Sequence, residues 1–339
     1  MTNKRHGVLM VNVGTPAAPT VPAVREYLRE FLGDPRVIDL PTPARWLLLN
    51  LVILPFRPRQ SAHAYQQVWT KDGSPLLLIS QAQRDALAAL LPEAEVVLGM
   101  QYGQPSLKAA RERFQSLGIT DVTLVPMYPQ YAEATSGATI ESWTGLHPET
   151  RVVPAFHGEA GFVDALAAHV RQTVAQANAE HVLFSFHGLP VRQIEKVCGT
   201  ADCAHSQGPC PALSATNARC YRAQCYATAK ALAQASGVEA NNTVAFQSRI
   251  KGSKWIGPFT EETLVELAQR GLKRLVVACP SFVADCLETL EEIAQRGAET
   301  FKAAGGESLT LVPAVNANEI FIAGLARVIR EQLQFDAAA

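Results

Sequence analysis

Residues 161–187 read GFVDALAAHVRQTVAQANAEHVLFSFH and contain the unit from which we expect the whole chain to be built. Residues 161–179 have the length and pattern of a helix, and residues 181–187 follow as a short, nearly continuous apolar run. Such a run predicts a strand of a parallel sheet that is covered on both faces. A helix that leads into a buried strand is typical of α/β folds.

The same alternation extends over the whole sequence, and it predicts a layered α/β fold with parallel strands and right-handed crossovers. The pattern runs twice, with a break near residues 148–153, so we expect two similar domains, residues 1–150 and 151–339. The expected strands are Gly7–Val13, Glu95–Tyr102, Asp121–Pro126, His181–His187, Thr243–Gln247, Arg274–Ala278 and Leu309–Pro313. The expected helices include Ser80–Leu91, Ser106–Leu117, Gly161–Ala179, Ala218–Ser236, Glu261–Gly271, Ala284–Ala304 and Glu319–Leu333.

The charge balance and the apolar runs restrict the partners of this chain. Its 339 residues include 30 Lys and Arg against 31 Asp and Glu, a formal net charge of -1. Nucleic acid is not an expected partner, because its binding usually requires a basic excess. The N-terminus lacks a signal-peptide pattern, and the longest apolar run, residues 46–56, is shorter than the ~20 residues of a spanning helix. We expect a cytoplasmic protein, free or attached to a membrane surface, and either a monomer or a homodimer.

Familiar nucleotide-binding and hydrolase motifs are absent from the sequence. It contains no G-x-x-x-x-G-K-[ST], no G-x-G-x-x-G after a strand, no G-x-S-x-G and no H-E-x-x-H. In parallel α/β sheets a ligand binds beyond the carboxyl ends of the strands. The candidate site residues are therefore those at these ends, where a cleft between the two domains is expected.

His187 is the first candidate, because it ends the strand expected at residues 181–187. Gly188 follows it, and the missing side chain of glycine lets a ligand or another backbone segment approach closely. An imidazole at this place can accept or give a proton near neutral pH. A structural histidine bonded to a backbone carbonyl is the alternative.

Acidic residues after the strand at residues 274–278 form the second candidate. Asp285, Glu288 and Glu292 are spaced i, i+3, i+7, which predicts one shared face of a helix that starts near residue 284. Glu291 points elsewhere. Carboxylates at such a place can hold a divalent cation or accept protons, and a solvated helix face is the alternative.

Five of the seven cysteines fall within one short stretch, an insertion at about residues 196–225. Disulfide bonds are not expected in a cytosolic chain. Thiolates clustered in sequence suit an iron–sulfur cluster or a structural zinc ion, and reduced cysteines without a metal are the alternative. The five are Cys198, Cys203, Cys210, Cys220 and Cys225.

Several rare peptides, among them Val11–Pro16, Ser185–Pro190 and Phe282–Glu292, occur in order along nearly the whole chain. They resemble those of the ferrochelatases, which insert Fe(II) into a porphyrin at the end of haem synthesis. The resemblance implies two Rossmann-like domains with the porphyrin in the cleft between them. It also implies a lyase that converts protoporphyrin IX and Fe(II) into protohaem and releases two protons. A sister chelatase that uses coproporphyrin, cobalt or nickel stays open, as does a non-catalytic haem or porphyrin carrier or iron–sulfur sensor. The peptides are Val11–Pro16, Phe31–Asp34, Tyr65–Trp69, Gly73–Leu76, Tyr128–Tyr131, Ser185–Pro190, Phe246–Arg249, Trp255–Pro258 and Phe282–Glu292.

The resemblance also gives roles to the candidate residues. His187 matches the family's histidine on one face of the macrocycle and is expected to accept pyrrole protons. Glu288 matches its partner carboxylate, and Glu292 lies one turn further along the same acidic path. These two carboxylates are expected to relay protons or to guide the metal. His187 and Glu288 are the expected ligands of the substrate iron.

Residues 42–60 correspond to the family's apolar lip over the mouth of the porphyrin pocket. A porphyrin that arrives from a bilayer makes a peripheral contact between this lip and the inner membrane a reasonable expectation. Arginines at the end of this lip, after its apolar run, are expected to pair with the porphyrin propionates. The expected porphyrin contacts are Val13, Arg57, Arg59, Ser74 and Tyr131.

The cysteine-bearing insertion is similar to that of bacterial ferrochelatases that bind a [2Fe-2S] cluster through internal cysteines. Cys225 falls where cluster-free members also have cysteine, whereas Cys220 replaces their usual aspartate. The resemblance thus implies that Cys225 is only the alternative ligand. The expected cluster ligands are Cys198, Cys203, Cys210 and Cys220.

Overall fold

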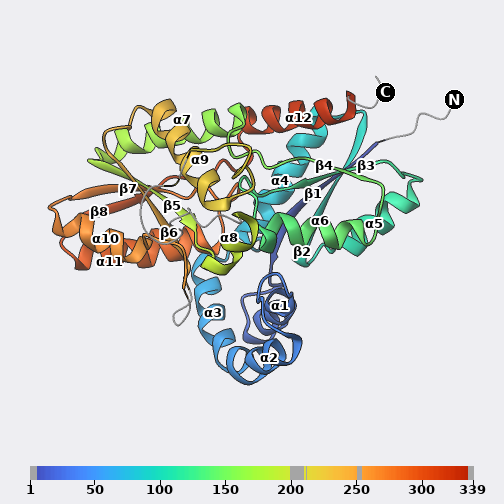
Figure 1. Ribbon diagram of the computed structural model, residues 1–339, viewed down its shortest axis with the longest axis horizontal. Coiled ribbons are helices and arrows are strands. Elements are labelled where there is room, and N and C mark those ends of the chain that lie inside the picture. The colour runs from blue at the N-terminus through green and yellow to red at the C-terminus, as the bar shows by residue number, and fades with distance from the viewer. Residues whose placement is uncertain (1–5, 199–209, 211, 250–253, 335–339) are drawn as a thin grey trace. The chain divides into compact units, whose positions relative to one another are not determined.

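In the part of the chain that the structure describes, the strands pair in parallel in two separate sheets of four. A computed structural model describes residues 6–198, 210, 212–249 and 254–334. The strand order is β2-β1-β3-β4 in the first sheet and β6-β5-β7-β8 in the second (Figure 1). The two orders are the same when strands are counted within each sheet. This repeat confirms the predicted α/β fold with two similar halves.

The first sheet consists of His6–Thr15 (β1), Ala94–Gly103 (β2), Val122–Pro126 (β3) and Thr150–Val152 (β4). The second consists of His181–His187 (β5), Asn242–Gln247 (β6), Arg274–Ala278 (β7) and Ser308–Leu311 (β8).

The helices that accompany the first sheet are Val21–Gly33 (α1), Thr42–Leu47 (α2), Leu48–Ile53 (η1), Leu54–Val68 (α3), Pro75–Leu90 (α4), Leu107–Ser116 (α5), Glu133–Gly137 (η2) and Ala138–Thr144 (α6). Those that follow in the chain are Ala160–Ala177 (α7), Val191–Cys198 (α8), Tyr221–Ser236 (α9), Thr260–Gln269 (α10), Glu288–Gly297 (η3), Ala298–Ala303 (α11) and Glu319–Gln334 (α12). The segments η1, η2 and η3 are π-helical.

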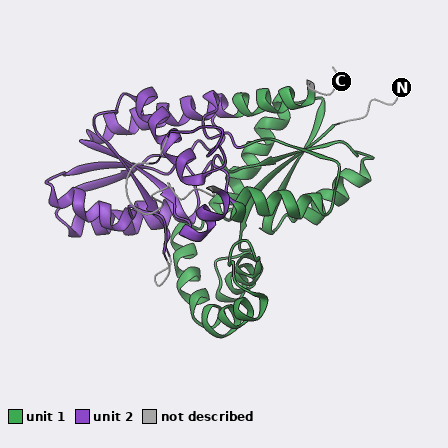
Figure 2. Ribbon diagram, viewed as in Figure 1, with its two compact units in different colours: residues 1–128, 133–154, 322–339 green, residues 129–132, 155–321 purple. Residues whose placement is uncertain are grey.

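Each sheet belongs to its own compact unit, drawn in different colours in Figure 2. The N-terminal part of unit 1 extends to Pro154 and therefore includes β4. Unit 1 also includes the chain from Ile322 onward. Unit 1 comprises residues 1–128, 133–154 and 322–339, and unit 2 comprises residues 129–132 and 155–321.

The core of unit 1 forms around the central strand β1, where Val8, Leu9, Met10 and Val11 have no exposed surface. Both neighbours of β1 are strands, and helices cover its two faces, which explains the continuous apolar run. Near its carboxyl end, Gly14 has a φ of 99°, and a Cβ atom there would lie 1.8 Å from the Tyr102 carbonyl oxygen. Only glycine fits where β1 passes β2 this closely.

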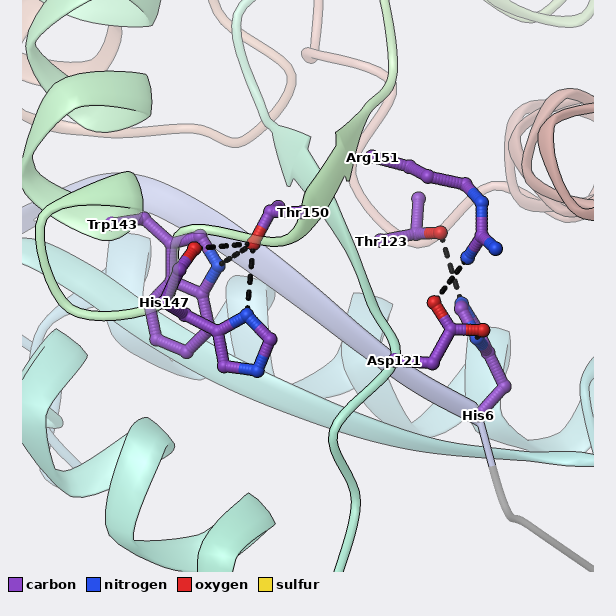
Figure 3. Close-up of polar contacts among 7 residues, drawn as sticks. All are labelled: His6, Asp121, Thr123, Trp143, His147, Thr150 and Arg151. Carbon is purple, nitrogen blue, oxygen red and sulfur yellow. Dashed lines mark hydrogen bonds and ion pairs between the residues drawn. The ribbon is translucent and has the colours of Figure 1, made fainter.

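The edge strand β4 was missed in the sequence because its three residues, Thr-Arg-Val, lack an apolar pattern. Polar side chains attach it instead. Figure 3 shows the Thr150 hydroxyl receiving a hydrogen bond of 3.0 Å from Trp143 Nε1 and donating one of 2.8 Å to the His147 carbonyl oxygen. The His147 ring stacks on Trp143 at 5.6 Å between centroids. These bonds join β4 to the helix α6 before it.

A second polar group ties together the amino ends of β1, β3 and β4 (Figure 3). His6 Nδ1 lies 3.0 Å from Asp121 Oδ2, and His6 Nε2 lies 2.9 Å from Thr123 Oγ1. Arg151 pairs with the other oxygen of Asp121. Burial lowers the pKa of His6, although Asp121 opposes this shift. Since this end of the sheet is opposite to the one that binds ligands, we assign the group a structural role.

Unit 2 repeats this arrangement around β5, in which Leu183 and Phe184 are fully buried. Leu183 packs in one cluster with Val277 of β7, Leu264 of α10 and Phe301 of α11. In the part of the chain that the structure describes, no helix is long and apolar enough to cross a membrane.

Candidate functional site

The carboxyl ends of β5 and β7 lie side by side in unit 2, and the chain leaves them in opposite directions. After β5 it continues to β6 on one side, and after β7 to β8 on the other. Such a switch point is where parallel α/β sheets form their binding crevices. His187 is the last residue of β5, and the segment after β7 leads to Glu288 and Glu292. The sequence-predicted acid–base residues are thus brought to one place.

The imidazole of His187 is held in one tautomer. Its Nδ1 lies 2.6 Å from the Gly188 carbonyl oxygen. Because a carbonyl oxygen can only accept, Nδ1 carries the hydrogen, and in the neutral ring the lone pair is on Nε2. A Cβ atom on Gly188 would lie 2.7 Å from the Gln247 carbonyl oxygen, so glycine is required beside the histidine. The ring of Phe282 contacts the imidazole with its centroid at 6.2 Å.

The helix after β7 differs from the prediction in start and type. Its first helical residue is Leu287 rather than a residue near 284, and it is π-helical from Glu288 to Gly297. Asp285 therefore precedes the helix, and its carboxylate accepts hydrogen bonds from Asn316 Nδ2 (2.8 Å) and Thr289 Oγ1 (3.1 Å). The predicted stripe of three carboxylates was wrong in this respect, because Asp285 serves the local turn.

Glu292 is a carboxylate whose pKa is raised by its surroundings. Burial raises its pKa most. The hydrogen bond from Ser248 and the charge interaction with His187 lower the pKa, whereas the charge interaction with Glu288 raises it. Glu292 is thus within electrostatic range of both His187 and Glu288. Ser248 was missed in the sequence, although its position directly after β6 is another strand end of the kind expected to face a ligand.

Glu288 begins the π-helix, and its carbonyl oxygen accepts a bond of 3.0 Å from Gln247 Nε2. Gln247 thereby connects β6 to the helix. The pKa of the neighbouring Cys286 thiol is raised, first by burial and then by Glu288. Glu291 instead accepts a bond of 2.7 Å from Arg296 Nε. The spacing predicted that Glu291 points elsewhere, and its carboxylate indeed binds Arg296.

The porphyrin contacts expected in unit 1 have different environments. Val13 is partly exposed near the carboxyl end of β1, as a packing contact with a ligand requires. Arg57 and Arg59 are exposed on α3. Ser74 is only 4% exposed, and its hydroxyl donates to Thr15 Oγ1 at 2.9 Å. The Ser74 hydroxyl hydrogen is therefore used within the protein in this conformation.

Tyr131 belongs to unit 2, where its backbone N–H donates to Gln224 Oε1 at 2.7 Å. The guanidinium carbon of Arg219 lies 4.4 Å from the centroid of the Tyr131 ring, and Arg219 also donates to the Tyr131 hydroxyl. Arg219 adds a positive charge next to this expected porphyrin contact.

The predicted cluster ligands are only partly within the described residues. The side chain of Cys198 and the whole of Cys203 lie outside them. Cys220 directly precedes α9 and is 2% exposed, and Cys210 accepts a bond of 2.8 Å from Arg222 Nη1. Among the side chains that are described, no three of His, Cys, Asp or Glu are arranged to hold a metal ion.

Cys225 is fully buried inside α9. Burial raises the pKa of its thiol well above the ordinary value; Tyr221 opposes this shift, and Cys210 and Cys220 add to it. Cys225 thus lies within electrostatic range of both Cys210 and Cys220. Arg222 is 1% exposed, and it also donates to the Gly257 carbonyl oxygen at 3.1 Å.

Comparison with known proteins agrees with this geometry. The chain matches the family model Ferrochelatase over residues 5–333. It is 45% identical to the ferrochelatase of Azotobacter vinelandii over 339 residues, which cover 96% of this chain and 98% of that one. It is 40% identical to the ferrochelatase of Coxiella burnetii (strain CbuG_Q212) over 337 residues, which cover 98% and 95%.

Among solved structures, SirB from Bacillus subtilis with Fe3+ shares the fold, with a TM-score of 0.51, 12% sequence identity and coverage of 97% of this chain and 95% of that one. At that identity the likeness shows the architecture alone. The family match, the two relatives and the meeting of His187 with Glu288 and Glu292 lead to one conclusion: the chain belongs to the ferrochelatase family.

Proposed function

We propose that this chain is a protoporphyrin ferrochelatase, a lyase that inserts Fe(II) into protoporphyrin IX to form protohaem. The observation that carries the proposal is the single tautomer of His187, which leaves Nε2 as a base at the switch point of unit 2. Family membership supplies the reaction class.

The reaction breaks two pyrrole N–H bonds, forms bonds from the ring nitrogens to Fe(II), and releases two protons. His187 Nε2 accepts the first of these protons and becomes an imidazolium with Nδ1 still bonded to the Gly188 carbonyl oxygen. The carboxylate of Glu292, within electrostatic range, stabilises that positive charge. A carboxylate with a raised pKa can then take the proton onward, because it binds a proton more tightly than an ordinary carboxylate does.

Glu288 is the first residue of the π-helix, so along the chain it lies closer to the end of β7 than Glu292 does. Carboxylate oxygens bind ferrous iron readily, so Glu288 is suited to guide the substrate metal toward the ring. In this scheme Glu288 acts on the metal and Glu292 on the protons.

An anaerobic assay tests this function. Purified protein is mixed with Fe(II) and protoporphyrin IX, and the conversion of the porphyrin absorption bands to those of haem is followed. Turnover by the wild type and its loss in His187→Ala would support the proposal. Parallel reactions with coproporphyrin, Co(II) and Ni(II) identify a sister chelatase if one of them is clearly faster. Tight porphyrin binding without turnover of any pair would instead identify a carrier.

The proposal includes a [2Fe-2S] cluster held by Cys198, Cys203, Cys210 and Cys220. Thiolates are the usual ligands of such clusters, and the Arg222 guanidinium 2.8 Å from Cys210 Sγ would stabilise a thiolate there. Cys225, which is fully buried inside α9, is the alternative ligand. When bound, the cluster would join the insertion to α9 and absorb visible light.

We extend the proposal to a peripheral contact of this cytoplasmic enzyme with the membrane. Residues 42–60 carry apolar side chains in solvent, with Trp46 59%, Leu51 60% and Phe56 72% exposed. Exposed apolar patches next to arginines suit the surface of an anionic bilayer. Co-sedimentation with anionic phospholipid vesicles should weaken in Phe56→Ser. Ile320→Ser, which removes an apolar side chain 51% exposed elsewhere, is the control and should bind as the wild type does.

A further inference from the structure

The strand that carries His187 is longer than its neighbour β7. On the β6 side its pairing continues to His187, which lies opposite Gln247. On the β7 side the last pair is Phe184 with Ala278. The backbone of β5 beyond Phe184 therefore needs other hydrogen-bond partners on that side.

Two side chains take the place of the missing strand. The Ser281 hydroxyl accepts a hydrogen bond of 3.2 Å from the backbone N–H of His187. The Tyr221 hydroxyl donates one of 2.7 Å to the His187 carbonyl oxygen. The two hydroxyls lie 2.9 Å apart, so they form one connected unit around a single residue. Both backbone polar groups of His187 are fixed by it.

We propose that Tyr221 is a positioning residue for iron insertion, which sets the direction of His187 Nε2 by holding the His187 backbone. The proposal rests on the function given above. The imidazole is attached to the His187 backbone through its side chain. Its Nδ1 is also held by the carbonyl oxygen of Gly188, the next residue. A rotation of the peptide between His187 and Gly188 would disturb both contacts together.

Tyr221 is suited to this role by its surroundings. Its side chain is 7% exposed, and its hydroxyl donates to the His187 carbonyl oxygen from within the protein. Tyr221 is the first residue of α9, directly after Cys220, and its hydroxyl also contacts the Cys225 thiol. The helix that carries Cys225 and directly follows Cys220 thus holds the backbone of the proposed base.

The kinetic test uses Tyr221→Phe, which removes the hydroxyl and keeps the ring. Misplacement of a catalytic group costs about tenfold to a hundredfold in rate, so we expect kcat to fall by that factor while the KM for porphyrin stays within about twofold. The matched control is Tyr226→Phe in the same helix, whose hydroxyl accepts from Arg222. This control should keep the wild-type kcat.

A double mutant separates positioning from general damage. Because Tyr221 acts through His187, Tyr221→Phe should have no further effect on the residual rate of His187→Ala. An equal loss in both backgrounds would overturn the proposal, as would a wild-type kcat in Tyr221→Phe. A wild-type protein without turnover would contradict the proposed function instead. In that case, nitrogen NMR of the His187 ring tests whether Tyr221 positions His187.

Nitrogen NMR of histidine-labelled protein reports the His187 ring directly and needs no turnover. His187→Ala identifies the signals. In the wild type and in Tyr226→Phe, the neutral ring should show a protonated Nδ1 and an unprotonated Nε2. In Tyr221→Phe, we expect the two nitrogens to shift toward averaged values as the tautomers mix. Unchanged signals in Tyr221→Phe would overturn the proposal.

Discussion

Ser248 binds both carboxylate oxygens of Glu292 from a left-handed backbone conformation. Its N–H lies 2.8 Å from Oε1 and its hydroxyl 2.6 Å from Oε2, and its φ is 63°. A residue other than glycine adopts this φ at a cost of about 1–2 kcal/mol, and such conformations cluster at functional sites. The two donors stabilise the ionised form of a carboxyl that burial would otherwise protonate.

Replacement of Ser248 by alanine should therefore shift the acid limb of the pH–rate profile to higher pH. Loss of the hydroxyl destabilises the Glu292 carboxylate, so the pKa of Glu292 rises further and a higher pH is needed to ionise it. The profile of kcat/KM measures this shift. A limb that stays in place or moves to lower pH would show that Glu292 is not the group titrating there.

Ser248→Gly is the companion variant. It also lacks the hydroxyl and should show the same shift of the limb. Because glycine adopts a φ of 63° without strain, Ser248→Gly should be more stable than Ser248→Ala by about 1 kcal/mol in chemical denaturation.

His187→Ala should reduce iron insertion to a small residual rate while porphyrin still binds. A positioned base contributes about 10²–10⁴-fold to a rate, and no second imidazole is bonded at this strand end among the described residues. Stopped assays give the rate and fluorescence quenching gives porphyrin binding. Turnover near the wild-type rate would remove His187 from the mechanism.

Glu288→Gln should reduce turnover far more than Glu291→Gln. The two substitutions are the same chemically, but Glu288 lies within electrostatic range of Glu292, and Glu291 is bonded to Arg296. Loss of the partly exposed pair between Glu291 and Arg296 should cost about 1 kcal/mol of stability or less. Initial rates for both variants decide the matter, and equal losses would contradict the assignment of Glu288.

Four cysteine substitutions should remove the colour of the purified protein, and a fifth should not. We expect about two iron and two sulfide per chain in the wild type. Cys198→Ser, Cys203→Ser, Cys210→Ser and Cys220→Ser should each bleach the visible spectrum, whereas Cys225→Ser should keep it. Colourless wild-type protein with one zinc would contradict the cluster. Bleaching in Cys225→Ser with colour retained in Cys220→Ser would exchange these two ligands.

The sequence predicted the strands more reliably than the features that depend on tertiary contacts. The strands His181–His187 and Arg274–Ala278 have the predicted bounds, because two-sided burial produces an unbroken apolar run. The strand Thr150–Val152 gave no such signal, since polar bonds of Thr150 hold it.

The site residues also divide into those that the sequence predicted and those that depend on tertiary contacts. His187 and Glu288 were found at strand ends or by resemblance. The start of the helix at Leu287 and the left-handed Ser248 were not predicted, because both depend on hydrogen bonds to residues far apart in sequence. The hydroxyls of Tyr221 and Ser281 that replace a strand partner of His187 could not be found for the same reason.

The bond between Tyr221 and His187 closes a loop of the chain, since the two residues are 34 positions apart and their contact is 2.7 Å. The segment between His187 and Tyr221 is therefore held at both of its ends. The entropy cost of such a closed loop grows only with the logarithm of its length, by about 0.6 kcal/mol for each doubling. Evolution could therefore lengthen, shorten or exchange this segment, cysteines included, at little thermodynamic cost and without moving the base beside it.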